Sequence, residues 1–240
     1  MESLRRYKTI AFALAYSMGL AILLYGQLRD WAYDDPFITF RYAENLARGL
    51  GFVYNSGERV LSTTTPLFAL LLAVLSHSGL DLPHLANLIG ALSLALGGLA
   101  LWDLARTWKT PLVGWVGLLL YPSFSLLLTT LGSEMPLYLA FCLGAFAFYA
   151  RRRYHLTALF IALAVLTRAD GALVGVILAA DYLIQTRRPS PGQRFCLSWS
   201  SPSPGSYSRL GILDHRCRRL WLRSSIREAW RSASVLGRAC

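Results

Sequence analysis

The chain has 240 residues, of which 55% are hydrophobic and only 15% charged, and its formal net charge is +11. Several apolar runs approach the roughly 20 residues that cross a bilayer as a helix, which excludes an ordinary soluble domain and predicts an all-α, polytopic transmembrane helix bundle. The Lys and Arg residues gather between these runs, so the positive charge indicates basic cytoplasmic loops beside a lipid bilayer, and no nucleic-acid partner is expected.

The first apolar run covers about residues 9–27 and follows Arg5, Arg6 and Lys8. This charge pattern is shared with signal peptides, but no clear cleavage site follows and further apolar runs do. A retained signal-anchor helix with a cytoplasmic N-terminus is therefore predicted. Two adjacent acids, Asp34 and Asp35, come soon after this run, on the opposite side of the membrane.

Two shorter segments follow the acid pair. Residues 36–49 have apolar side chains at roughly helical spacing and a proline in the first turn, which predicts a helix lying on the membrane surface. Residues 66–75 are strongly apolar, but ten helical residues rise only about 15 Å, half of a bilayer core. If this segment crossed, the basic loops at 106–109, 151–153 and 187–188 would lie outside, so a re-entrant or interfacial helix is predicted.

The remaining spans are predicted at about residues 85–104, 112–128, 137–150, 156–166 and 172–184, which makes residues 1–188 the membrane region. Counting the crossings places five charged residues together on the external side: Asp34, Asp35, Glu134, Arg168 and Asp170. Each has a simpler explanation, as a helix cap, a first-turn acid or a local ion pair. All of them together, in so apolar a chain, favour a shared polar site.

The composition changes sharply after Pro189, because residues 193–240 are rich in Arg and Ser and contain no Lys. The segment 189–240 is either a basic, disordered cytoplasmic tail or the product of a frameshift, since a GC-rich gene read out of frame gives about this mixture. The frameshift is favoured, because the change falls where a further span is expected. The chain would then be a truncated copy of a longer protein.

Three stretches of the first external loop have a distinctive pattern. They are Asp34-Asp35-x-x-Ile-Thr-Phe-Arg-Tyr-Ala-x-Asn-Leu46, Gly49-x-Gly-Phe-Val-Tyr-Asn-x-Gly-Glu-Arg-Val60 and Ser62-Thr-Thr-Thr-Pro66-Leu67. Together they resemble the N-terminal part of GT-C-fold membrane glycosyltransferases, most closely the bacterial branch around the mycobacterial terminal arabinofuranosyltransferases and more distantly the protein mannosyltransferases. The later turns Gly132-Ser-Glu-Met-Pro-Leu137 and Leu166-Thr-Arg-Ala-Asp-Gly171 are also similar. The resemblance covers about residues 7–188.

The resemblance implies a hexosyl- or pentosyltransferase of the bacterial inner (plasma) membrane. Such an enzyme moves a sugar from a polyprenyl-phosphate donor to an extracytoplasmic glycan, lipid or protein acceptor of the cell envelope. It implies that Asp34 or Asp35 is the catalytic base. It further implies that Arg168 binds the donor phosphate. Arg41 is a weaker candidate for a phosphate or acceptor contact, and a solvated surface charge is the favoured interpretation of this residue.

Glu134 and Asp170 would be supporting acids in such a site. No metal ligands are assigned, and whether a divalent cation takes part is left open. Because members of the family usually carry further spans, an inactive remnant is one alternative. A small transporter-like bundle that uses the same acids for cation or proton passage is a less favoured one.

Overall fold

The computed structural model describes residues 2–55, 57 and 63–187, and all regular structure within these ranges is helical. The prediction of an all-α chain is thus confirmed for the described residues. The chain divides into two compact units, residues 1–181 and 182–240, and the site discussed below lies wholly within the first. The predictions made for the segment 189–240 lie outside the described residues.

Proline marks the start of many helices. In chain order the elements are α1 (Glu2–Leu28), α2 (Pro36–Ala47), α3 (Pro66–Leu75), the 3₁₀ turn η1 (Ser76–Ser78), α4 (Leu82–Thr107), α5 (Pro111–Leu120), α6 (Ser125–Thr129), α7 (Met135–Ala150), α8 (Tyr154–Thr167) and α9 (Gly171–Arg187). Helices α2, α3, α4, α5 and α7 each have a proline at the first or second position, where its missing N–H removes no helical hydrogen bond.

These helices follow the predicted ranges closely, with two differences. α1 begins earlier than predicted, at Glu2. The stretch 112–128, predicted as one span, contains two helices, because α5 ends at Leu120 and α6 is a separate helix of five residues. Pro122 lies at this break. A proline ends a helix because it has no N–H to donate to the carbonyl one turn earlier and because its ring clashes with that carbonyl.

Two of the described helices are long and apolar enough to cross a membrane: Tyr7–Leu28, within α1, and Leu82–Thr107. The other apolar helices are shorter. Large apolar side chains are exposed on several of them, as at Phe12 on α1, Leu112 on α5 and Leu173 on α9. Apolar surface of this kind favours association with a membrane.

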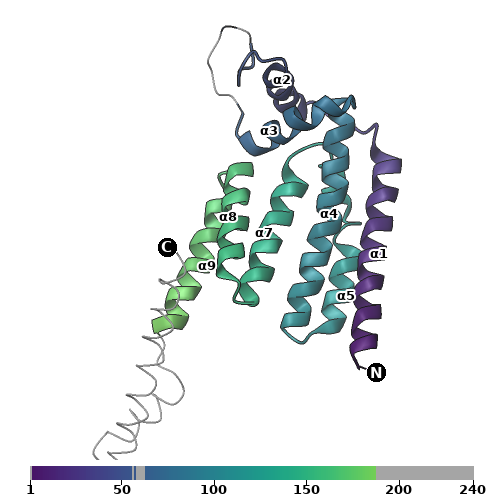
Figure 1. The fold of residues 1–240 in the computed structure, drawn as a ribbon, viewed down its shortest axis with the longest axis vertical. Helices are drawn as coiled ribbons and strands as arrows, with labels where there is room; N and C mark the ends of the chain where they lie inside the picture. Colours follow the sequence, from purple (N-terminus) through teal and green to yellow (C-terminus); the bar gives the residue numbers. More distant parts are fainter. Residues whose placement is uncertain (1, 56, 58–62, 188–240) are drawn as a thin grey trace, which may run out of the picture. The chain divides into compact units, whose positions relative to one another are not determined.

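α4 is the central helix of the first unit. It packs against α1, α5 and α7, and α7 packs in turn against α8 (Figure 1). α2 and α3 pack on each other at one end of these helices, where a buried cluster that includes Phe40, Phe68, Leu72, Leu85 and Leu137 joins them to the first turns of α4 and α7. The loops that precede α2 and α7 are therefore held at this end.

The opposite end holds the basic connections. Figure 1 shows the start of α1, the α4–α5 connection and the α7–α8 connection at that end. Lys109 and Arg151 lie in these connections, and Arg151 pairs with Asp103 of α4. Acidic loops and basic loops thus lie at opposite ends of the helices.

Candidate functional site

The acid pair lies in the short segment between α1 and α2. Asp34 and Asp35 are both exposed. Asp35 occupies the N-cap position of α2, but within the described part of the chain its side chain makes no capping hydrogen bond. Asp34 Oδ1 accepts the backbone N–H of Asp35 at 3.0 Å, while the two backbone carbonyls accept the first amides of α2. Helix capping therefore does not account for the Asp35 carboxylate.

A second group of charges joins α7 to the α8–α9 turn. Arg168 Nη1 donates to Glu134 Oε1 at 2.8 Å, and Arg168 Nε and Nη2 donate to Asp170 Oδ2 at 3.3 and 3.0 Å. The Glu134 side chain is only 12% exposed, whereas that of Asp170 is 59% exposed. The hydrogen bond to Glu134, and then that to Asp170, raises the pKa of Arg168, so the guanidinium stays charged. This cluster carries two carboxylates on one cation.

The α8–α9 turn is shaped by Gly171. A Cβ at this position would lie 2.6 Å from the carbonyl carbon of Ala164, so α9 begins in direct contact with the backbone of α8. Within the same turn the Arg168 N–H donates to the Ala164 carbonyl at 2.8 Å, and the Gly171 N–H donates to the Arg168 carbonyl at 3.0 Å. These bonds hold the backbone from which the Arg168 side chain reaches Glu134.

Tyr33 connects the acid pair to the Glu134 turn. Its side chain is half-buried and lines the same pocket as Leu131 and Gly132 of that turn. Burial raises the pKa of Tyr33, and the negative charges of Glu134, Asp35 and Asp34 raise it further. The structure therefore brings together the three segments that carry the predicted acids: 33–35, 133–134 and 168–170.

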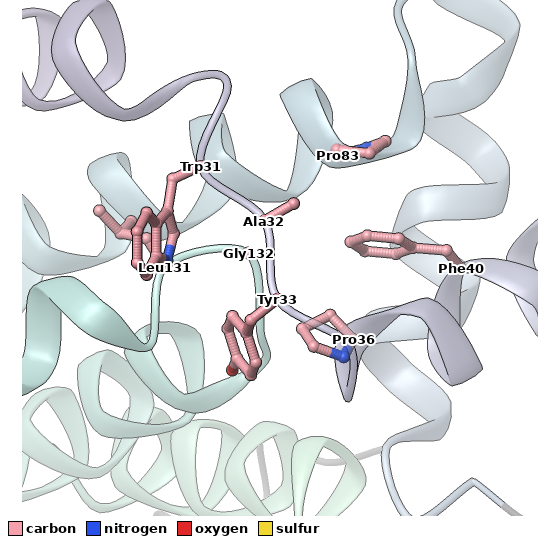
Figure 2. Close-up of a pocket in the computed structure, with 8 residues that line it drawn as sticks. All are labelled: Trp31, Ala32, Tyr33, Pro36, Phe40, Pro83, Leu131 and Gly132. Atoms are coloured by element: carbon pink, nitrogen blue, oxygen red, sulfur yellow. The ribbon is translucent and has the colours of Figure 1, made fainter.

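A shallow apolar pocket lies beside the acid pair. Figure 2 shows its lining, which comprises Trp31, Ala32, Tyr33, Pro36, Phe40, Pro83, Leu131 and Gly132. These residues come from the α1–α2 segment, from the first turns of α2 and α4, and from the turn before α7. The lining carries no charged side chain and the pocket is too shallow to hold a ligand, so it is not itself the candidate site.

Among the described residues, Arg41 forms its ion pair within α2 and not with Glu134 or Asp170. It is on the exposed face of α2 and pairs with Glu44 at 3.2 Å, and Glu44 also pairs with Arg48 at 2.6 Å. Pairs of this kind along an exposed helix contribute little to stability. The structure does not join Arg41 to the cluster of Glu134, Arg168 and Asp170, and its predicted phosphate contact stays a prediction.

Asn87 and His84, which sequence reasoning missed, hold the start of the acidic segment. Asn87 Nδ2 donates to the carbonyls of Arg29 and Trp31, both at 2.8 Å. His84 Nε2 lies 3.1 Å from Asp30 Oδ1, and this hydrogen bond is the main cause of the lowered pKa of Asp30. Asn87 could have been recognised from the sequence, because an amide within an apolar helix indicates hydrogen-bond partners on another segment.

Among the residues that the structure describes, no group of three or more His, Cys, Asp or Glu side chains is arranged to hold a metal ion. Glu134 and Asp170 instead share the Arg168 cation. Within the described site, the exposed carboxylates of Asp34 and Asp35 can accept a hydrogen bond from a hydroxyl group, and the remaining N–H donors of Arg168 can bind an acceptor oxygen.

No protein-family model, curated protein or solved structure matches this chain.

Proposed function

We propose that the chain is a GT-C-like membrane glycosyltransferase that moves a sugar from a polyprenyl-phosphate donor to a hydroxyl group of an extracytoplasmic acceptor. The observation that carries the proposal is the meeting of segments 33–35, 133–134 and 168–170 at one end of an apolar helical bundle. These are the segments whose sequences resemble that family. A transporter has less support, because the acids lie at helix ends rather than within the helices.

The acid pair supplies the base. One carboxylate of Asp34 or Asp35 accepts the proton of the acceptor hydroxyl, whose oxygen bonds to the anomeric carbon as the bond from that carbon to the phosphate oxygen breaks. The leaving polyprenyl phosphate keeps the electron pair of the broken bond. Both carboxylates are exposed, as a group that meets an incoming substrate must be.

Arg168 supplies positive charge for the phosphate. Its contacts to Glu134 and Asp170 engage one N–H each of Nε, Nη1 and Nη2. A guanidinium has five N–H donors, so donors on Nη1 and Nη2 remain for phosphate oxygens. The more buried Glu134 would keep the side chain in place, while the more exposed Asp170 is the partner that a phosphate would displace.

In this proposal the protein is a multi-pass protein of the bacterial inner membrane, with a cytoplasmic N-terminus and an extracytoplasmic acidic end. The separation of acidic and basic loops to opposite ends of the helices supports this orientation, because basic loops are enriched on the cytoplasmic side (Figure 1).

The test is a sugar-transfer assay with the full-length chain, a radiolabelled polyprenyl-phosphate sugar and a mixed acceptor extract. Asp34→Asn and Asp35→Asn are compared with Asp81→Asn, an exposed acid at the N-cap position of α4. At least one of the first two variants is expected to lose about 100-fold or more in rate, while Asp81→Asn keeps its rate. Unchanged transfer in both acid-pair variants would refute the base assignment, and the absence of transfer by the unaltered chain would favour an inactive remnant.

A further inference from the structure

One side chain of α4 lies between two of the loops that carry candidate acids, the loop before α2 and the loop before α7. Asn87 is 1% exposed, and its Nδ2 donates to the carbonyls of Arg29 and Trp31 at 2.8 Å. These two carbonyls lie just before the acid pair in the chain. Rotation of the Asn87 amide would leave its N–H groups without partners in an apolar environment, so its orientation is fixed.

The other side of the same amide faces the turn before α7. A Cβ at Gly132 would lie 3.2 Å from Asn87 Oδ1, an atom that is buried and has no hydrogen-bond partner among the described residues. Gly132 has a φ of +90°, in the region that favours glycine. The Cα hydrogen of Gly132 is thus the group that Oδ1 faces.

Gly90 extends this contact along α4. It lies one turn after Asn87, and a Cβ there would lie 2.6 Å from Leu131 Cδ2. The turn formed by Leu131 and Gly132 therefore rests directly on the surface of α4, two residues before Glu134. A displacement of this turn has no free space on the α4 side and must move the Asn87 amide.

We propose that Asn87 is a positioning residue that sets the placement of the Asp34–Asp35 pair relative to Glu134. This inference rests on the proposed function, because it concerns the spacing of the acids in that site. The reason is steric: the Asn87 amide donates to the backbone of residues 29–31 on one side and faces Gly132 on the other, so a displacement of Gly132 moves the amide and, through it, residues 29–31.

The first test is hydrogen–deuterium exchange of the full chain in lipid nanodiscs, comparing Gly132→Ala with Gly51→Ala. Both glycines have a φ of +90°, but a Cβ at Gly51 would have nothing within 4 Å. Gly132→Ala is expected to speed exchange in the segment 29–36 about tenfold, as two hydrogen bonds from Asn87 weaken, whereas Gly51→Ala changes it by less than about twofold. Equal exchange of this segment in the two variants would overturn the proposal.

A second pair of variants covers the case in which Gly132→Ala fails to fold. Asn87→Asp is compared with Asn45→Asp, since Asn45 is also buried and its Nδ2 donates to the carbonyls of Val53 and Tyr54 at 2.9 and 2.8 Å. Asn87→Asp should speed exchange in both 29–36 and 129–135, and Asn45→Asp in 51–55. A change confined to 29–36 in Asn87→Asp would reduce Asn87 to a local anchor and overturn the coupling.

These exchange measurements need no substrate, so their failure is distinct from a failure of the proposed function. With a chain active in sugar transfer, Gly132→Ala should lower kcat about tenfold and leave the donor KM within about twofold, because misplaced catalytic groups slow the chemical step. An unchanged kcat would count against a positioning role even if exchange increased.

Discussion

The two hydrogen-bonded ion pairs of Arg168 are expected to differ in strength. Both carboxylates bind the same guanidinium at similar distances, 2.8 Å for Glu134 and 3.0 Å for Asp170. Asp170 accepts from two guanidinium nitrogens and Glu134 from one, but the Glu134 side chain is only 12% exposed and that of Asp170 is 59% exposed. Solvent screens the second pair far more than the first.

The magnitudes follow from this difference. A charge-assisted hydrogen bond contributes about 1.5–3 kcal/mol, and with Arg168 itself 32% exposed we expect a coupling of about 1–2 kcal/mol between Glu134 and Arg168. For Asp170 and Arg168 we expect less than about 1 kcal/mol, as for other exposed pairs. The hydrogen bonds to Glu134 and Asp170 raise the pKa of Arg168, so the stability that its charge contributes is present throughout the neutral range and is lost only as the pH rises through the raised pKa.

Two double-mutant cycles measure these couplings. Glu134→Gln and Asp170→Asn, which keep shape but remove charge, are each combined with Arg168→Met, and the free energy of unfolding is measured by SDS titration of the full chain in mixed micelles. A coupling for Asp170 as large as that for Glu134 would refute the argument from burial. It would also remove the reason for assigning Asp170 as the partner that a phosphate displaces.

Three further predictions concern other parts of the structure. Subtracting the alkaline absorbance titration of Tyr33→Phe from that of the unaltered chain should show that Tyr33 ionises above pH 10, because burial raises its pKa. The stability that the neutral phenol contributes is therefore present below pH 10 and is lost as the pH rises through the raised pKa. A normal titration midpoint would contradict this. Gly171→Ala should lower the free energy of unfolding by about 1–3 kcal/mol, since its Cβ would lie 2.6 Å from the α8 backbone, whereas Gly26→Ala, with nothing within 4 Å, should be neutral or stabilising. In a cysteine-free background, cysteine at Ser78 should react with a membrane-impermeant maleimide added outside intact cells and cysteine at Lys109 should not; the reverse pattern would contradict the proposed orientation.

The helices of this chain could be predicted from the sequence, because apolar runs of limited length follow prolines that fix their starts. The exception was the run over 112–128. Its apolar content suggested one span, but Pro122 breaks the backbone ladder whatever the hydropathy of its neighbours. The missing backbone N–H of Pro122 therefore indicates the end of a helix more reliably than the hydropathy of the surrounding residues.

The site could be predicted only in part. Counting crossings put the five charged residues at one end of the helices, but it could not show that Arg168 lies between Glu134 and Asp170, which depends on how α7 and α8 pack. The proposed local pairing of Arg168 with Asp170 is present, and the contact to Glu134 is additional to it. Asn87 was missed because one polar residue barely changes the hydropathy of a 26-residue helix.

The contact between Glu134 and Arg168 also has a consequence for synthesis. The two residues are 34 positions apart in the chain, so Glu134 leaves the ribosome well before its partner. Asn87 lies 58 and 56 positions after Arg29 and Trp31, so the segment after α1 also gains its hydrogen bonds only once α4 has been synthesised. Because the chain is made residue by residue, the nascent chain carries the Glu134 carboxylate without its cation until the α8–α9 turn is made. A chain released before Arg168 should therefore be a poor membrane protein and a ready substrate for quality-control proteases.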